Sequence, residues 1–384
     1  MKVAIVLTTR WWRGSIDHDG YASAIRAMGH VPLLVCLGND AGDADFEVVV
    51  ASREEQSSVY FWRNLRIDVA IVWNWLHGSE LLAVIRQADI KIIVRADTDG
   101  NFSQRVFPIG SFTRMIGNGK SLRNRVGLAR YFFQRRLSAA YIEDQEAIAT
   151  MDASDSVIVE TDTAKQNVSR FLCKYNRSDL TRKLKTVSHS VSETVLRNAS
   201  RFNISRKPLI FCGGRWDSPQ KDVNLLCKTL YLILRSRPDC HVVVSGPIPE
   251  ADRSAIESIS CNIECTGAVD RTFVIDCLLK SRFLLSSSRW ETQPIGALEA
   301  LCLGATVVAP PLPSFLDMLE SGRFGTLSRR RTARSLARAS IAELEQWDKG
   351  LRDGTAISKF WSSHVSNEKV ISGVLGDFVE PVRA

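Results

Sequence analysis

Residues able to hold a diphosphate come together early in the second half of the chain. Gly213, Gly214, Arg215 and Lys221 follow the apolar run 208–212 and precede a helical pattern. Small residues at the end of a strand let backbone amides approach an anion, and the next helix adds its positive end. Arg215 would then bind phosphate oxygens through paired hydrogen bonds, and Lys221 as a point charge. Taken alone, the same residues also fit a solvated loop beside a helix.

Two carboxylates lie eight residues apart around a predicted helix start. Glu291 follows the strand pattern Phe283–Ser286, and Glu299 falls about one turn into the predicted helix Gly296–Cys302. Ligands of α/β folds bind at this edge of the sheet, outside the carboxyl ends of the strands. An ionised carboxylate accepts hydrogen bonds from neighbouring hydroxyl groups, so the pair suits a sugar. Acids near a helix start also favour the helix dipole, which would by itself account for Glu291.

Short β-branched runs alternate with helical patterns along the chain, which predicts parallel sheets built from βαβ units. Gly246 ends one of these runs and forms another turn at the same edge. The predicted strands are Val3–Thr8, Val31–Leu37, Glu47–Ala51, Val69–Trp73, Lys91–Val94, Ser156–Glu160, Leu209–Cys212, His241–Ser245, Asn262–Cys265, Phe283–Ser286 and Thr306–Ala309. The predicted helices are Gly20–Ala27, Glu80–Gln87, Ser121–Met151, Thr163–Lys174, Val223–Arg235, Asp252–Ser258, Thr272–Leu279, Gly296–Cys302 and Thr332–Gln346.

A length of 384 residues suits two α/β domains of similar size. We predict a first domain at 1–195, a second at 196–355, and a terminal amphipathic helix within 356–384 that packs back on the first domain. The apolar runs are strand-length, and none approaches the ~20 residues that span a bilayer. The N-terminus is interpreted as a first strand and not as a signal peptide.

The order of these motifs resembles the donor half of the family 4 retaining glycosyltransferases. Gly-Gly-Arg-x5-Lys, a Gly-Pro turn, and Glu-x7-Glu with a following Ala-Leu-Cys-Leu-Gly match that family across Pro208–Leu327, and more faintly across Asp155–Val191. The resemblance implies the GT-B fold, an α/β architecture of two Rossmann-like domains facing across a deep cleft. It also implies transfer of a sugar from a nucleoside-diphosphate sugar to a hydroxyl with retention, in cell-envelope polysaccharide, lipopolysaccharide or glycolipid synthesis.

The resemblance assigns roles residue by residue. Arg215 and Lys221 would hold the donor diphosphate and stabilise the leaving nucleoside diphosphate, and Glu291 would lie beside the transferred sugar. Glu299 would bind the ribose hydroxyls. The other implied donor-binding residues are Gly213, Gly214, Gly246, Thr266, Gly267, Thr292, Gln293, Pro294 and Ile295. The family often has Gly after the first Glu, whereas this chain has Thr-Gln-Pro, and proline removes one amide donor.

The first half departs from the family pattern. The family usually has a Gly-rich first loop, where this chain has Thr-Arg-Trp-Trp-Arg-Gly. We expect Gly14 to allow close approach, and Arg10 and Trp11 to form part of a lip at the acceptor. His77 is a further cleft candidate, with a structural role as the alternative.

Asp97 and Asp99 stand near the point where the family often has a His at a strand end. Asp-x-Asp is also the metal motif of the other glycosyltransferase fold, GT-A. Such acidic pairs are common in turns, and the metal alternative leaves the second-half motifs unexplained. We therefore expect both residues to face the cleft near the acceptor, and we predict no metal and no other cofactor.

The charge distribution points to anionic partners. The net charge is +8, and the stretches Gly119–Ser138 and Arg323–Arg338 each hold six basic residues and no acid. Such patches favour phospholipid headgroups, a phosphorylated lipid carrier or nucleic acid. Together with the resemblance, the expected partners are a nucleotide-sugar donor, a glycan or lipid-linked acceptor and an anionic membrane surface, and no nucleic acid is expected. The mixture of aromatic and basic residues in Arg130–Arg136 is typical of an interfacial helix. A solvated basic helix face is the alternative.

Nine scattered cysteines indicate reduced thiols and a cytoplasmic protein, either free or peripheral on the inner membrane face. Cys261 and Cys265 are the one close pair and lack a nearby His, which disfavours zinc. Three other functions stay open. A sugar-nucleotide epimerase shares the scaffold, although the Glu-x7-Glu run disfavours it. A catalytically inactive sugar-nucleotide binder fits the same motifs. A nucleic-acid binder fits the pI of about 9.1 but lacks a recognition motif.

Overall fold

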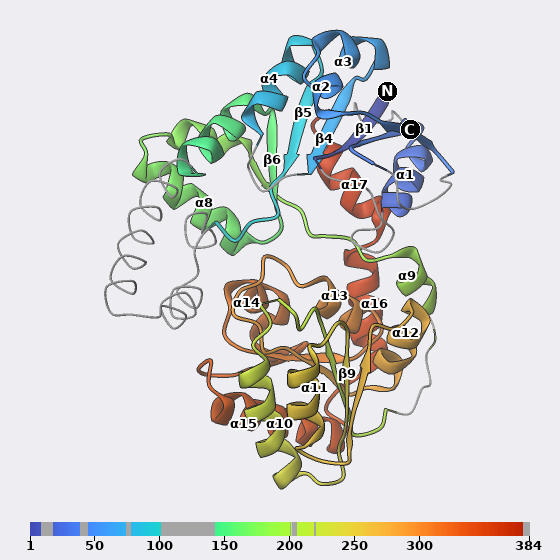
Figure 1. The fold of residues 1–384 in the computed structure, drawn as a ribbon, viewed down its shortest axis with the longest axis vertical. Helices are drawn as coiled ribbons and strands as arrows, with labels where there is room; N and C mark the ends of the chain where they lie inside the picture. Colours follow the sequence, from blue (N-terminus) through green and yellow to red (C-terminus); the bar gives the residue numbers. More distant parts are fainter. Residues whose placement is uncertain are drawn as a thin grey trace. The chain divides into compact units, whose positions relative to one another are not determined.

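The computed structural model of this chain describes residues 1–8, 18–38, 45–73, 78–100, 143–199, 201, 206–218 and 220–378. They form two compact units (Figure 1): unit 1 is Met1–Val187 with Gly373–Ala384, and unit 2 is Ser188–Ser372. The division at Val187 lies a few residues before the predicted boundary at residue 195. Several residues singled out above lie outside the described ranges, namely Arg10, Trp11, Gly14, His77 and the basic stretch 119–138.

Unit 1 is built on a parallel sheet with the strand order β3-β2-β1-β4-β5-β6-β7 within the described residues. Its central strands are buried on both faces and consist mostly of apolar residues. The strands are β1 (Lys2–Leu7), β2 (Val31–Cys36), β3 (Glu47–Val50), β4 (Val69–Trp73), β5 (Lys91–Arg95), β6 (Ser156–Val159) and β7 (Leu184–Thr186). The helices are α1 (His18–Ala27), α2 (Arg53–Gln56), α3 (Val59–Leu65), α4 (Ser79–Gln87), α8 (Asp162–Lys174), the 3-10 helix η1 (Ser178–Lys183), and a helical stretch at 143–153.

Unit 2 is a second parallel sheet with the order β10-β9-β8-β11-β12-β13. Its strands are β8 (Leu209–Gly213), β9 (His241–Ser245), β10 (Ile263–Gly267), β11 (Phe283–Leu285), β12 (Thr306–Ala309) and β13 (Gly325–Leu327). Its helices are α9 (Glu193–Asn198), α10 (Val223–Ser236), α11 (Glu250–Glu257), α12 (Arg271–Lys280), α13 (Ile295–Cys302), α14 (Pro313–Leu319), the 3-10 helix η2 (Glu320–Gly322), α15 (Ala333–Asp348) and α16 (Gly354–His364). Helix α17 (Asn367–Leu375) crosses the division between the units.

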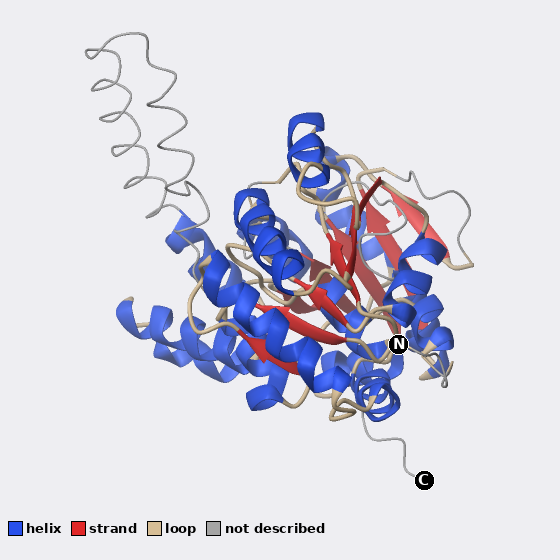
Figure 2. Ribbon diagram, turned by 90° about the horizontal axis from the view of Figure 1, so that it is seen from below, coloured by secondary structure: helices blue, strands red, loops and turns tan. Residues whose placement is uncertain are grey.

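Each face of the unit 2 sheet packs against its own set of helices, with helices on both sides of the strands (Figure 2). Along β8, Phe211 joins a core with residues of α12, α13, α14 and α16, whereas Ile210 and Cys212 join a core with residues of α10 and α15. Alternating side chains of one strand therefore fill both cores, as a strand period of two requires. The predicted α/β fold with two parallel sheets is confirmed.

The C-terminal region differs from the single helix that the sequence suggested. Helix α16 packs on α13 inside unit 2, where Trp361 joins the core and the Ser358 hydroxyl donates to the Cys302 carbonyl at 2.5 Å. Helix α17 begins directly after Ser366, whose hydroxyl accepts from the amide of Lys369 at 3.3 Å. Hydroxyl acceptors of this kind satisfy otherwise unpaired amides of a first helical turn, so they favour a helix start.

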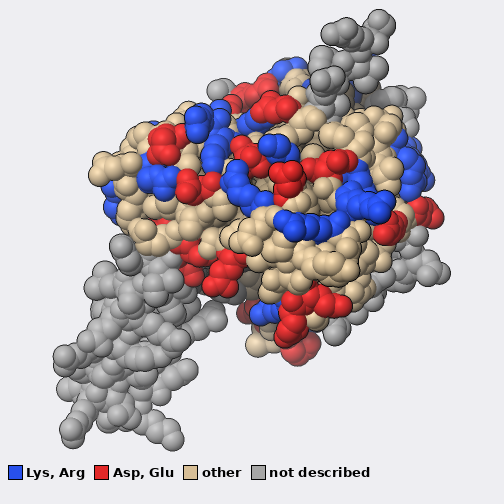
Figure 3. All heavy atoms as spheres, turned by 90° about the horizontal axis from the view of Figure 1, so that it is seen from above, with Lys and Arg blue, Asp and Glu red and all other residues tan. Residues whose placement is uncertain are grey.

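Charged side chains of both signs share the face of the molecule seen in Figure 3, where Lys and Arg are interspersed with Asp and Glu. Within the described part of the chain, no helix is both long and apolar enough to cross a membrane.

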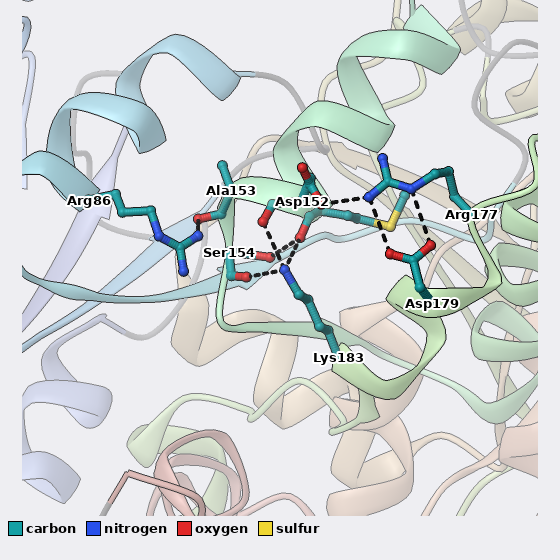
Figure 4. Close-up of polar contacts among 8 residues, drawn as sticks. Arg86, Asp152, Ala153, Ser154, Arg177, Asp179 and Lys183 are labelled. Carbon is teal, nitrogen blue, oxygen red and sulfur yellow. Dashed lines mark hydrogen bonds and ion pairs between the residues drawn. The ribbon is translucent and has the colours of Figure 1, made fainter.

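A polar cluster ties the 3-10 helix η1 to the end of the helical stretch 143–153 (Figure 4). The Lys183 ammonium donates to the carbonyls of Met151, Asp152 and Ser154 at 3.2, 2.8 and 2.7 Å. These carbonyls lie at or just past the end of the helix, where a cation is favourable because helical carbonyls lack amide partners there. Burial lowers the pKa of Lys183. Arg177 adds an ion pair with Asp152 at 2.6 Å.

Candidate functional site

Glycine residues let three loops of unit 2 meet at the carboxyl edge of the sheet. Gly246, directly after β9, has a φ of +116°. A Cβ atom placed there would lie 1.9 Å from the carbonyl oxygen of Gly214, so no other residue fits without moving the backbone. The Gly214 amide donates to the Ser245 carbonyl at 3.1 Å, and the Gly246 amide donates to the Gly267 carbonyl at 2.8 Å. The ends of β8, β9 and β10 are therefore joined backbone to backbone.

Lys221 and Glu291 form an ion pair across this edge. The Lys221 Nζ lies 2.5 Å from Glu291 Oε1 and 3.1 Å from Ser288 Oγ, and the Ser288 hydroxyl donates to the same carboxylate oxygen at 2.6 Å. The Gln220 side-chain amide donates to the other oxygen, Oε2, at 2.9 Å. Glu291 is buried, with 7% of its side chain exposed. The loop after β8 and the loop after β11 are thus held together by one carboxylate.

Arg215 lies on the same loop but points to solvent. Its side chain is 76% exposed and forms a long ion pair with Asp217 at 3.7 Å. The neighbouring Trp216 is buried, and its indole nitrogen donates to the Ser245 carbonyl at 3.0 Å. This anchor fixes the backbone beside Arg215 while leaving the guanidinium free to reach a ligand.

Glu299 lies in α13 and is buried, where it pairs with Arg271 at the start of α12. Burial raises the pKa of Glu299, and the charge and hydrogen bond of Arg271 oppose that rise. A buried carboxylate with one cationic partner keeps acceptor positions for hydroxyl groups of a ligand.

The loop between Glu291 and α13 is shaped by hydrogen bonds of its own. The Gln293 side-chain oxygen accepts from the backbone amide of His189 at 2.6 Å and from the Ser188 hydroxyl at 3.1 Å. Pro294 occupies the position before the helix, and its carbonyl accepts from the Ala297 amide at 2.9 Å. The predicted sugar contact of Gln293 therefore competes with a structural contact to the start of unit 2.

Thr266 and Gly267 close the end of β10. The Thr266 hydroxyl donates to the carbonyl of Gly267 at 3.1 Å, and Gly267 has a φ of +68°. The turn predicted beside the nucleotide base is thus an ordered one, although none of its side chains is charged.

A carboxylate next to Lys221 was missed at the level of the sequence. Asp222 starts α10, where its side chain accepts from the Leu225 amide at 3.2 Å. The same carboxylate pairs with Arg331 and, at 3.3 Å, with Arg289. Burial opposes ionisation, yet the hydrogen bonds from Arg331 and the Leu225 amide, with the two arginine charges, lower the pKa of Asp222. The Arg331 Nε also donates to the Ser288 carbonyl at 3.2 Å, so Arg331 bridges both loops.

Gln220, Ser288, Arg271 and Arg331 were likewise not predicted. The sequence carried only weak signals for them: Gln220 adjoins Lys221, Ser288 ends a run of three serines, and Arg331 belongs to the second basic stretch. The carboxylate partners of Gln220, Arg271 and Arg331 lie 71, 28 and 109 residues away along the chain, so spacing along the sequence does not reveal these contacts.

In unit 1, the Asp97–Asp99 turn is organised by Glu160 at the end of β6. The carboxylate of Glu160 accepts from the amides of Asp97 and Thr98, each at 3.2 Å. Burial and the charge of Asp97 raise the pKa of Glu160 to about 8, against the opposing charge of Arg95, which lies 3.8 Å away. Asp97 has a φ of +44°, and the Asp99 carbonyl accepts from the Asn167 side chain at 2.9 Å. The two predicted acceptor-side carboxylates therefore belong to one ordered turn at a strand end.

Two parallel Rossmann-like sheets, one of them with glycine turns and paired charges at its carboxyl edge, define the GT-B class of fold. Residues 207–346 match the family model of the glycosyl transferases group 1. This segment contains the motifs between Gly213 and Glu299, so the resemblance to the glycosyltransferases that they suggested is confirmed there.

Similar proteins include one curated relative and several solved structures of similar fold. A phosphatidyl-myo-inositol mannosyltransferase of Propionibacterium freudenreichii subsp. shermanii is 29% identical over 188 residues. The match spans 48% of this chain and 48% of that relative, about half of each. A glycosyltransferase from Rickettsia africae has a similar fold, with a TM-score of 0.65 at 12% identity, covering 98% of this chain and 97% of that chain. Anabaena Alr3699/HepE in complex with UDP and glucose has a TM-score of 0.64 at 12% identity, covering 98% of this chain and 99% of that chain.

Proposed function

We propose that this protein transfers a sugar from a nucleoside-diphosphate sugar to a hydroxyl of a glycan or lipid-linked acceptor, with retention at the anomeric carbon. The observation that carries the proposal is the meeting of Lys221, Glu291 and the glycine turns at one edge of the unit 2 sheet. The family match, the name of the mannosyltransferase relative and the UDP and glucose of the Anabaena structure support it.

Lys221 and Arg215 are proposed to neutralise the diphosphate of the donor as it leaves. Lys221 is held in place, whereas Arg215 is exposed and able to close on a ligand. Charge placed in advance where negative charge develops lowers the barrier, and removal of one such group costs on the order of 10²–10³ in kcat. Lys221→Gln and Arg215→Gln are therefore expected to lower turnover by about that factor.

Glu291 and Glu299 are proposed to accept hydrogen bonds from hydroxyl groups of the sugar and the ribose. Both carboxylates are buried at the same sheet edge, and each already has a cationic partner, Lys221 or Arg271. Removal of either should raise the KM for the donor, because hydroxyl contacts bind both the ground state and the transition state.

No metal or other cofactor is proposed, because Lys221 and Arg215 supply the positive charge that a divalent ion would otherwise provide. Turnover should survive EDTA without loss. Inactivation by EDTA and recovery with Mg²⁺ or Mn²⁺ would contradict this part of the proposal.

The first experiment is a thermal-shift screen of the full chain against UDP-, GDP- and ADP-sugars, followed by turnover measurements with the donor that stabilises most. A proton NMR spectrum of the product then reports the anomeric configuration. No stabilisation by any of these donors, and wild-type turnover in Lys221→Gln, would each contradict the proposal. A sugar nucleotide whose sugar has been epimerised at one carbon, without transfer to an acceptor, would instead indicate the epimerase alternative.

The acceptor is proposed to belong to cell-envelope polysaccharide, lipopolysaccharide or glycolipid synthesis, with the protein bound at an anionic membrane surface. The relative's name includes a phosphatidylinositol acceptor, and the second basic stretch exposes Arg329, Arg330, Arg334 and Arg338. Cosedimentation with phosphatidylglycerol vesicles at 0.15 M salt tests this, because the attraction of basic patches to anionic lipid survives partly at that ionic strength. Equal recovery with vesicles of neutral lipid would contradict the membrane proposal.

A further inference from the structure

Lys221, which is predicted to bind the donor diphosphate, already forms an ion pair with Glu291 of the same chain. Lys221 has 19% of its side chain exposed and Glu291 has 7%, so their contact of 2.5 Å is largely removed from water. Attraction between opposite charges is stronger in such a place than at an exposed surface. An anionic ligand that approaches Lys221 must therefore compete with Glu291.

The carboxylate is held from both sides. Oε1 accepts from Lys221 and from the Ser288 hydroxyl, and Oε2 accepts from the Gln220 side-chain amide. Gln220 also donates to the carbonyl of Trp290 at 2.9 Å, which fixes its orientation. A carboxylate has about four acceptor positions, and these three donors take most of them. An acceptor position on Glu291 becomes fully available to a sugar hydroxyl only when one of these three donors moves away.

The other candidate cation offers a contrast within the same loop. Arg215 pairs with Asp217, but the distance is 3.7 Å and the two side chains are 76% and 51% exposed. An exposed pair of this kind contributes at most about 1 kcal/mol, and solvent screens it. Each of the two cations thus has an ion pair within the chain. The Lys221–Glu291 pair is short and largely buried, whereas the Arg215–Asp217 pair is long and exposed.

We propose that Glu291 is the internal counter-ion of Lys221, and that a donor diphosphate displaces it. The proposal rests on the function proposed above. It adds that binding of the diphosphate to Lys221 and binding of the sugar hydroxyls to Glu291 are coupled. When the diphosphate takes Lys221, the Oε1 atom of Glu291 loses a donor and becomes available to hydroxyl groups of the sugar. A nucleoside diphosphate without a sugar makes no use of that vacated position.

This exchange favours sugar nucleotides over the product of the reaction. The intact donor replaces the lost Lys221–Glu291 contact with a phosphate–Lys221 contact and a hydroxyl–Glu291 contact. The departing nucleoside diphosphate supplies only the first of these, and Glu291 then competes with it for Lys221. Glu291 is therefore a specificity residue that also promotes product release.

The test compares two single substitutions that each remove one negative charge, Glu291→Gln and Asp217→Asn. Glutamine has nearly the shape of glutamate and retains an oxygen that accepts from Ser288 or Gln220, so the loop connections can persist. Binding of inorganic pyrophosphate, UDP, GDP and ADP to the full chain is measured by calorimetry at 0.15 M salt. A far-UV circular dichroism spectrum and a melting curve check that each variant is folded.

Glu291→Gln is expected to bind pyrophosphate about tenfold more tightly than wild type, because one charge-assisted contact no longer has to be broken. Asp217→Asn is expected to change the affinity by less than about threefold, as for an exposed pair. Ser288→Ala, which removes one anchor of Glu291, should shift the affinity in the same direction as Glu291→Gln but less. The ratio of donor to nucleoside diphosphate affinity should fall in Glu291→Gln.

Unchanged or weaker binding of pyrophosphate by folded Glu291→Gln overturns the exchange, as does an equal gain in Asp217→Asn. If wild type still binds a nucleoside diphosphate in that case, the proposed function stands without the exchange. If neither wild type nor any variant binds pyrophosphate or a nucleoside diphosphate at millimolar concentration, the proposed function falls together with it.

Discussion

Replacing Gly246 with Ala tests whether the backbone contacts at the sheet edge hold the site in shape. The added Cβ would lie 1.9 Å from the Gly214 carbonyl oxygen, well inside a van der Waals contact. The loop after β8 would have to move by about 1 Å, a displacement that can cost roughly 10² in rate at an active site. The φ of +116° adds strain for any residue with a Cβ, roughly 1–3 kcal/mol.

We therefore expect Gly246→Ala to lower the free energy of unfolding by about 2–4 kcal/mol, the strain together with some overpacking. The value of kcat/KM for the donor should fall by roughly 100-fold. Urea unfolding followed by tryptophan fluorescence measures the first quantity, and steady-state turnover with the donor found in the screen measures the second.

Gly296→Ala is the matched control. Gly296 lies in the first turn of α13, next to the Glu291 loop, and a Cβ there would meet only Leu284 Cδ1, at 3.9 Å. Alanine in a helix is favoured over glycine by roughly 0.5–1 kcal/mol, so this variant should be as stable as wild type or more so. Wild-type stability and turnover in Gly246→Ala would refute the argument, and an equal loss in both variants would show that the effect is not specific to the Gly214 contact.

Three further predictions concern single charged side chains. Lys183→Met should lower the unfolding free energy by about 1–3 kcal/mol in urea, because three carbonyls near the end of the helix 143–153 lose their donor; a loss no larger than that of an exposed lysine variant such as Lys207→Met would contradict this. Glu160 has its pKa raised to about 8 from an ordinary value of 4.5, so the folded protein holds the extra proton between these values. The stability that Glu160 contributes is complete below pH 4.5 and is lost as the pH rises through 8; Glu160→Gln should flatten this part of the pH profile, and a parallel profile would count against the assignment. Arg331→Gln should raise the donor KM more than it lowers stability, because Arg331 joins Asp222 to the Ser288 carbonyl beside Lys221, and Arg331→Lys should recover only part of the loss since it cannot make both contacts; an effect on melting temperature alone would indicate a purely structural role.

Local sequence was enough to predict most of the two sheets. Strand β4 is a continuous run of apolar residues, and β9 has three consecutive valines at its centre, as expected for strands buried on both faces. The short strands β7 and β13 were missed. Each has three residues, and the pairing of β13 depends on Gly325, where a Cβ would lie 2.0 Å from the Val307 carbonyl oxygen of the neighbouring strand. Such a steric requirement is set by the neighbouring strand β12, so it leaves no periodic pattern in the residues of β13 itself.

The candidate site was likewise predictable from the sequence only in part. The sequence by itself determined which residue types stand at the strand ends, because glycines, a lysine and two glutamates at set distances from apolar runs must fall on one edge of a parallel sheet. Only the tertiary structure decided how they pair. Lys221 and Glu291 are 70 positions apart in the chain, and Arg331 and Asp222 are 109 apart. Their contacts arise because strand order in the sheet brings β8 beside β11, and a carboxylate buried there needs a cation whose place in the sequence is not otherwise constrained.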